Sequence, residues 1–383
     1  MIERTIKDSI LSLSKEYPVI LVQGPRQSGK TTLVKTLFPE KKYITLEDID
    51  TRSRAIEDPR GFLSNIPDGA ILDEVQRAPD ILSYIQSIVD SNNKMGMFIL
   101  TGSSNLLLME AVSQSLSGRV AIFKLLPLSM LEVKDIEIGW SIEKRILNGF
   151  YPRLLTQKMD VSAFFRNYIE TYVERDVRRV LNIRNIDSFR RFLVCVVQRI
   201  GSTLDITSLA SDAMVSTKTV SEWLSILDAS FICFRLQPYF SNRSKRLAKR
   251  PKIYFYDTGL ACALLGIVDE EQLSNDRLRG SLFENMLIVD MLKRKYNKYT
   301  SEEFYFYRTL DGVEVDLVME KGRKLYPMEI KSSQTFNPDW ASSLCKFEAE
   351  YSDECEKASI IYGGNESFKF KNINVFGYLD TIS

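Results

Sequence analysis

The chain has 383 residues, 44% of them hydrophobic, so its length allows about two or three domains with substantial cores. Its 51 basic and 50 acidic side chains nearly cancel, which excludes a global charge that draws it to nucleic acid or acidic lipid. Histidine is absent, which excludes histidine-dependent catalytic triads and zinc sites with imidazole ligands, and leaves carboxylates, lysine, arginine and bound metal for any chemistry.

The first motif along the chain is a complete G-x-x-x-x-G-K-[ST] phosphate loop between an apolar run at 19–22 and a helix-like stretch at 31–37. The residues expected to contact a nucleotide are Gly24, Pro25, Arg26, Gln27, Ser28, Gly29, Lys30, Thr31 and Thr32. Backbone N–H groups and the helix N-terminus would hold the phosphates, Lys30 would reach the terminal ones, and the Thr31 hydroxyl would bind Mg²⁺. The alternative, a glycine turn without a ligand, does not explain the strand and helix on either side.

A second apolar strand at 69–72 ends in Asp73 and Glu74, the pattern of a Walker B element. Asp73 is expected to hold Mg²⁺ through water, and Glu74 to act as the base that activates the attacking water. The alternative is an acidic strand end that caps the next helix. Because a kinase needs no water-activating carboxylate, the pair favours ATP hydrolysis.

The next strand, at 97–100, is followed by small polar residues where the additional-strand class of P-loop ATPases carries a sensor of the γ-phosphate. The candidates are Thr101, Ser103 and Ser104, and turn or helix-cap chemistry is an equal alternative for each.

Arg119 follows a helix-like run. It is a candidate arginine finger, acting in cis or from a neighbouring subunit, and a surface arginine is the alternative.

The alternation of strands and helices stops near residue 131, and the pattern is then helical from 161 to 236. Within it, 204–210 leads through a short turn into 217–228, the spacing of a helix-turn-helix. Strand-like sequence at 231–236 and 252–256 follows, so this segment resembles a winged helix.

DNA binding by this segment is a hypothesis that the charges of its second helix do not favour. The second helix carries Lys218 against Glu222 and Asp228, which is unfavourable for a helix in the major groove. The stronger basic feature is the run Arg243, Lys245, Arg246, Lys249, Arg250 and Lys252. This run would bind a phosphate backbone. The alternative is a solvated loop or a docking surface for another domain.

The last third of the chain predicts a helix near 283–293 and then a β-hairpin. Its strands, 312–318 and 325–331, flank a turn at 320–323. With a four-residue loop, Met319 would pair with Lys324.

That register would place Asp316 opposite Pro327 and diagonal to Glu329, with Lys331 on the same face as Glu329. Together with Glu284 on the preceding helix, Asp316 and Glu329 are candidate metal ligands, and Lys331 is a candidate catalytic group that positions water for phosphodiester cleavage. The alternative is alternating charge on a solvent-facing strand.

The arrangement of a helix glutamate, a strand aspartate and E-x-K resembles the PD-(D/E)xK nuclease superfamily. The whole chain resembles prokaryotic AAA-type ATPases whose C-terminal domain of uncharacterised function has a restriction-endonuclease-like core. The matching segments are 24–33, 72–76, 101–104, 117–119, 126–128, 245–260, 314–316 and 329–331. The resemblance implies an α/β protein with an AAA-like parallel-sheet domain at 1–155, a helical, winged-helix-like domain at 156–275 and a nuclease-like domain at 276–383.

These features predict a Mg²⁺-dependent ATPase coupled to a nuclease-like effector, with ATP and Mg²⁺ as cofactors and DNA and a second copy of the chain as candidate partners. The alternatives are a nucleotide-controlled interaction module with an inactive nuclease fold, and DNA regulation without cutting. No apolar run approaches the roughly 20 residues of a membrane span and no signal-peptide pattern opens the chain, so we expect a cytoplasmic protein without a membrane partner.

Overall fold

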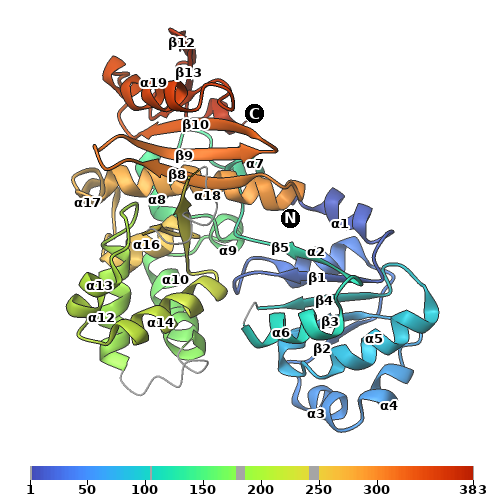
Figure 1. Cartoon of the computed structure of the whole chain (residues 1–383). Coiled ribbons are helices and arrows are strands. Elements are labelled where there is room, and N and C mark those ends of the chain that lie inside the picture. The colour runs from blue at the N-terminus through green and yellow to red at the C-terminus, as the bar shows by residue number, and fades with distance from the viewer. Residues whose placement is uncertain (1, 104–105, 178–185, 241–249, 383) are drawn as a thin grey trace.

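The computed structural model describes residues 2–103, 106–177, 186–240 and 250–382. It is an α/β protein with a five-stranded parallel sheet, a helical middle and an eight-stranded mixed sheet. In Figure 1 the N-terminal sheet (blue to cyan) lies to one side, the middle helices (green to yellow) to the other, and the C-terminal sheet (orange to red) above both.

The first sheet is parallel throughout, in the order β2-β3-β4-β1-β5. Its strands are β1 (Val19–Gln23), β2 (Tyr43–Thr45), β3 (Ile71–Asp73), β4 (Phe98–Gly102) and β5 (Val120–Lys124). The helices of this part are α1 (Lys7–Leu13), α2 (Lys30–Leu37), α3 (Ile49–Glu57), α4 (Pro59–Ser64), α5 (Ile81–Asn92), α6 (Leu106–Ser115) and α7 (Met130–Val133). Strands β1, β3 and β4 are buried along their whole length, as expected for parallel strands covered on both faces. The N-terminal prediction of a parallel sheet flanked by helices is confirmed.

The middle of the chain is helical, as predicted. Its helices are α8 (Ile142–Asn148), α9 (Pro152–Thr156), α10 (Val161–Tyr168), the π-helix Ile169–Val177, α12 (Ile186–Val197), α13 (Ile206–Ala213), α14 (Thr217–Ala229), α16 (Thr258–Leu265) and α17 (Glu270–Ser274). Met214 ends α13 in a left-handed conformation, and the Ser216 side chain caps α14. These two helices occupy the predicted helix-turn-helix positions, and the winged-helix assignment stays a prediction.

The second sheet runs β12-β13-β11-β10-β9-β8-β6-β7. Its strands are β6 (Cys233–Pro238), β7 (Lys252–Phe255), β8 (Glu303–Arg308), β9 (Glu314–Lys321), β10 (Lys324–Lys331), β11 (Ser359–Tyr362), β12 (Phe368–Phe370) and β13 (Ile373–Gly377). Helix α18 (Arg279–Lys298) packs on one face through the same core as Leu317 and Ile330, and α19 (Ala341–Glu350) packs on the other with Val318 and Leu325. Because β6 pairs with β8, the hairpin β6–β7 from the middle of the chain completes the C-terminal sheet.

The register predicted for the β9–β10 hairpin is wrong by two residues. Lys321 pairs with Lys324 and Leu317 with Met328, so the loop has two residues rather than four. Gly322, with φ +65°, takes the first loop position, where two-residue hairpin turns favour glycine because their twist matches that of the strands. Asp316, one residue beyond the last of these pairs, therefore comes opposite Glu329 and not Pro327.

None of the helices in the described part of the chain combines the length and hydropathy needed to cross a membrane.

Candidate functional site

The phosphate loop connects β1 to α2 at the carboxyl edge of the first sheet. Gly29 precedes α2 in a left-handed conformation with φ +94°, which only glycine adopts easily. A side chain at Gly24 would overlap the carbonyl oxygen of Leu125. Both motif glycines are therefore required by the backbone path itself.

Lys30 is folded into this loop. Its ammonium donates to the carbonyl oxygens of Gly24 and Pro25 at 3.0 and 2.8 Å, and the residue is 6% exposed. Burial lowers the pKa of Lys30 to about 8, against the opposing charges of Glu74 and Asp73. The carbonyls hold the ammonium inside the loop, where a phosphate would compete for it.

Asp73, at the end of β3, accepts hydrogen bonds from three hydroxyl groups. Thr31 donates at 2.9 Å and Tyr43 at 2.6 Å to one carboxylate oxygen, and Thr101 donates to the other. The structure therefore brings the predicted metal ligands Thr31 and Asp73 together, with Thr101 beside them. Tyr43 was not predicted, because no motif marks it and only the pairing of β2 with β3 brings it to Asp73.

Glu74 lies immediately beyond β3 in a left-handed conformation, with φ +59°. Its carboxylate accepts a hydrogen bond from the side-chain amide of Gln76, in the short helix Val75–Arg77. The charges of Glu74 and Asp73 both raise the pKa of Lys30 against the effect of burial.

Several buried side-chain atoms in this region have no hydrogen-bond partner within the described part of the chain. They belong to the end of β1, the phosphate loop, the turn after β3 and the turn after β4: Gln23 Oε1, Ser28 Oγ, Gln76 Oε1 and Ser103 Oγ. Buried polar atoms are normally paired, so a group of unpaired ones at a sheet edge indicates a place for a polar ligand or water. Ser104, the third sensor candidate, lies outside the described residues.

Arg119 is not brought to the phosphate loop. It precedes β5, its backbone carbonyl accepts from the amide of Val19 at 3.2 Å, and its guanidinium forms an ion pair with Asp90 at 2.5 Å. Val19 begins β1 whereas the loop follows its end, so Arg119 lies at the opposite edge of the sheet. A role in cis therefore does not fit this geometry, and the role in a neighbouring subunit stays a prediction.

A buried arginine outside the motif supports the loop. Arg4 donates to the backbone carbonyls of Ser28 at 2.8 Å and Leu126 at 2.7 Å, and pairs with Glu132 at 3.2 Å. No local pattern marks Arg4, because its partners lie 24 to 128 residues away in the chain.

A second constellation, the carboxylate cluster, consists of Glu284, Glu314, Asp316 and Glu329. Asp316 Oδ2 lies 3.3 Å from the ammonium of Lys331, which in turn lies 2.5 Å from Glu329 Oε1. The fold thus brings Glu284, Asp316, Glu329 and Lys331, the residues predicted for the nuclease-like site, into one network between α18 and the β9–β10 hairpin. Glu329 Oε2 is buried and has no hydrogen-bond partner among the described residues.

Lys252 of β7 enters the same cluster and was not assigned to it from the sequence. Its ammonium lies 2.6 Å from Glu314, 3.3 Å from Glu284 and 3.8 Å from Asp316, and its side chain is 2% exposed. Burial lowers the pKa of Lys252, but these carboxylates outweigh burial and raise it above its usual value.

Two of the carboxylates are hard to ionise. Burial, reinforced by Asp316, raises the pKa of Glu284 to about 7 and that of Glu329 to about 8. Across the described ranges, no three histidine, cysteine, aspartate or glutamate side chains form a group that could hold a metal ion. Lysine ammonium groups lie between these carboxylates. Metal binding by Glu284, Asp316 and Glu329 stays a prediction.

Of the predicted basic run, Arg243 to Lys249 lie outside the described residues. Arg250 pairs with Asp205 at 2.8 Å, and Lys252 points into the carboxylate cluster. Lys252 is therefore buried away from any phosphate backbone, whereas the Arg250 side chain is 68% exposed.

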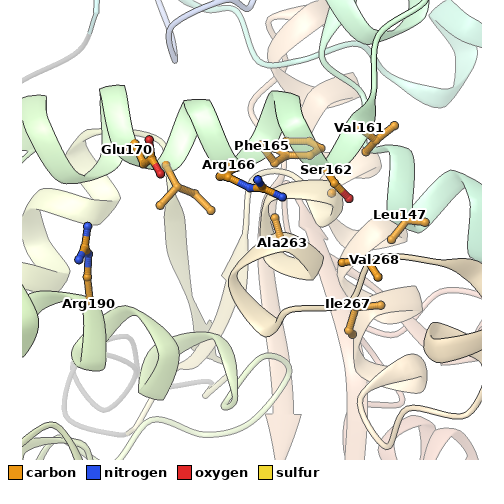
Figure 2. Close-up of a pocket in the computed structure, with 12 residues that line it drawn as sticks. Leu147, Val161, Ser162, Phe165, Arg166, Glu170, Arg190, Ala263, Ile267 and Val268 are labelled. Atoms are coloured by element: carbon orange, nitrogen blue, oxygen red, sulfur yellow. The ribbon is translucent and has the colours of Figure 1, made fainter.

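Figure 2 shows a pocket of about 290 Å³ between α10 and α16. Helix α10 supplies Val161, Phe165 and Arg166, the π-helix supplies Glu170, and the segment after α16 supplies Ile267. None of the residues predicted to act in a site lines this pocket.

The parallel sheet, its phosphate loop and the Thr31–Asp73 pair define a P-loop ATPase. In agreement, residues 16–134 match the family described as an AAA domain, while 139–271 and 279–381 match two domains of unknown function, DUF8612 and DUF4143. The chain is therefore an AAA-type P-loop ATPase.

Its relatives extend over nearly the whole chain. An uncharacterized protein of Mycobacterium tuberculosis, with an equivalent in Mycobacterium bovis, is 30% identical over 356 residues, which cover 92% of this chain and 78% of the relative. An uncharacterized protein of Methanocaldococcus jannaschii is 22% identical over 332 residues, 78% of this chain and 71% of that one. The chain belongs to the family of these mycobacterial proteins.

Solved structures resemble it more distantly. A Walker-type ATPase of Pyrococcus abyssi is 16% identical with a TM-score of 0.43, covering 69% of this chain and 96% of that one. AMPPCP-bound DnaA from Aquifex aeolicus is 16% identical with a TM-score of 0.30, covering 58% and 85%. Likenesses this distant carry no argument about activity.

Proposed function

We propose that the protein binds ATP with Mg²⁺ and hydrolyses it at the carboxyl edge of the first sheet. The observation that carries the proposal is the Thr31–Asp73 hydrogen bond of 2.9 Å, which joins the phosphate loop to the Walker B strand, and Glu74 follows Asp73 directly in the chain. The unpaired polar atoms around this place fit a polar ligand.

Each residue has a definite task in this proposal. The backbone N–H groups of the loop and the Lys30 ammonium bind the phosphates. Thr31 and, through water, Asp73 would hold Mg²⁺, which neutralises charge on the phosphates. Glu74 orients the attacking water and accepts its proton, and Thr101 or Ser103 contacts the γ-phosphate.

Glu74→Gln separates binding from hydrolysis. The amide keeps the size of the carboxylate but cannot take a proton, so ATP binding should persist while turnover falls by about 100-fold or more. Calorimetry with ATP and Mg²⁺ and a phosphate-release assay measure the two properties. The exposed Glu40, changed to Gln, is the matched control; a Glu74→Gln protein that turns over at the wild-type rate would show that Glu74 is not the base.

We also propose a second function for the carboxylate cluster, metal-dependent phosphodiester cleavage with DNA as the substrate. Its support is the convergence of Glu284, Asp316, Glu329 and Lys331, together with the unpaired, buried Glu329 Oε2. A metal ion would bind Asp316 and Glu329 and supply an activated water, in competition with the ammonium groups, while Lys331 positions that water.

The test uses the full chain, because β6 and β7 complete the C-terminal sheet. Mn²⁺ or Mg²⁺ should raise the melting temperature and support cleavage of plasmid or single-stranded DNA. Asp316→Ala should abolish both effects, whereas Asp311→Ala in the adjacent exposed turn should abolish neither. Loss of cleavage in Lys331→Met would support its catalytic role. Should the wild type neither bind metal nor cut, the domain is an inactive nuclease relative, and a nucleotide-controlled interaction module takes its place.

A further inference from the structure

We infer that Gln76 positions Glu74, the proposed catalytic base, by fixing the orientation of its carboxylate through a hydrogen bond from the side-chain amide. The inference rests on the proposed hydrolysis and adds to it a residue that acts through Glu74 rather than on the nucleotide. Its support lies in the orientation of the amide, in the space it occupies and in the way its backbone is held.

The amide has one chemically acceptable orientation. An ionised Glu74 has acceptors and no donors, so the Gln76 amide must present its nitrogen to the carboxylate, as it does. This leaves Gln76 Oε1 buried and without a hydrogen-bond partner among the residues that the structure describes. An apolar side chain would avoid an unpaired buried oxygen, so packing alone does not explain a glutamine here.

The neighbouring strand makes room for this amide. A side chain at Gly102, the last residue of β4, would overlap Gln76 Oε1. Gly102 is paired with Gln23, the residue directly before the phosphate loop. The amide of Gln76 thus lies between Glu74 and β4, the strand that carries Thr101.

The backbone around Gln76 is held on both sides. Val75 is completely buried in the core, and Arg77 forms an ion pair with Glu47 at 3.4 Å. The Arg77 amide donates to the Glu74 carbonyl at 3.0 Å, which closes the turn on Glu74. A rigid turn with a left-handed Glu74 would leave the carboxylate free to rotate, and the Gln76 amide removes that freedom.

Two substitutions separate positioning from packing. Gln76→Met keeps the length of the side chain without the donor, and should lower kcat by about tenfold or more while the Kd for ATP stays within about twofold. Gln76→Glu keeps the shape but places a second carboxylate against Glu74, and should lower kcat further. A packing role predicts the opposite order, because glutamate fits the space better than methionine.

Two further variants guard against misfolding and secondary effects. Gly102→Ala leaves Gln76 chemically intact but displaces its amide, and should lower kcat without changing ATP affinity. In the Glu74→Gln background, Gln76→Met should cause no further loss of single-turnover hydrolysis, since Gln76 acts through Glu74. Thermal melting establishes that each variant is folded.

The outcomes distinguish this inference from the proposed function. If the wild type hydrolyses ATP and the turnover of Gln76→Met is within about twofold of the wild-type value, the role of Gln76 is overturned and the proposed ATPase stands. A kcat that is higher for Gln76→Glu than for Gln76→Met also overturns the positioning role of Gln76. A wild-type protein that binds ATP but never hydrolyses it removes the proposed function first, and this inference with it.

Discussion

The backbone of the phosphate loop determines the environment, and therefore the pKa, of the Lys30 side chain. Lys30 donates hydrogen bonds to two loop carbonyls and is buried, and this burial lowers its pKa to about 8 although two carboxylates lie near it. The motif predicts that this lysine contacts phosphate. Burial in the folded loop makes its ammonium group easier to deprotonate than an exposed lysine.

The lowered pKa of Lys30 predicts a pH-dependent affinity for ATP. Below about 8 the ammonium is already charged and binding takes up no proton; above it, the neutral amine must gain one to pair with phosphate. Affinity should therefore fall by up to about tenfold per pH unit above this pKa. Calorimetry in buffers of different ionisation enthalpy should detect proton uptake at the higher pH. Lys30→Ala should not bind ATP, whereas Lys15→Ala, an exposed control, should behave as wild type; constant affinity through this range would contradict the prediction.

At the scale of elements, the segment before α1 is tied to the phosphate loop and to α7 by one arginine. Arg4 reaches Ser28 in the loop, Leu126 after β5 and Glu132 in α7, and the Glu132 side chain is fully buried. Glu132 also accepts from the backbone amides of Thr5 and Ser129, so the ion pair lies within a hydrogen-bonded network.

Arg4→Met should destabilise the protein by about 3–5 kcal/mol, because it leaves the buried Glu132 without its guanidinium partner. Denaturant or thermal unfolding followed by circular dichroism measures the effect. Arg323→Met, at the exposed β9–β10 turn, is the matched control and should change stability by less than about 0.5 kcal/mol. A similarly small effect of Arg4→Met would show that water or a neighbouring group replaces the guanidinium.

At the scale of the whole molecule, residues from distant parts of the chain meet in the carboxylate cluster. Lys252 comes from the β6–β7 hairpin, which lies between α14 and α16 in the chain, and Glu284 comes from α18. The other end of α18 reaches the N-terminal segment, where Asn297 donates to Thr5 at 2.7 Å and accepts from Ser9 at 2.9 Å. Helix α18 therefore contacts both the cluster and the segment that carries Arg4.

Lys252→Met should increase the affinity of the cluster for Mn²⁺ by about tenfold or more, because Glu284, Glu314 and Asp316 lose their shared ammonium. Lys252→Arg keeps the positive charge and should not gain affinity, and Lys324→Met is an exposed control. Metal titration followed by calorimetry and thermal melting gives the readout. Equal Mn²⁺ binding by wild type and Lys252→Met would mean that the ammonium does not compete with the metal.

Contiguous features of the chain could be predicted without the fold. The phosphate loop, the strand before it and the helix after it are one stretch of backbone, so glycine geometry and local pattern suffice to place Lys30 and Thr31. The adjacent Asp73 and Glu74 are likewise local, and the closeness of Asp73 to Thr31 follows from parallel strands that end at one edge.

Tertiary structure alone decided which distant side chains complete these sites. Tyr43, Arg4 and Lys252 act through partners far away in sequence, and no local pattern marks such contacts. The β9–β10 register depended on whether the turn held two residues or four, a difference in loop geometry that shifts the partner of Asp316. Local sequence therefore predicts the phosphate loop and its candidate residues, whereas long-range packing determines which side chains surround them.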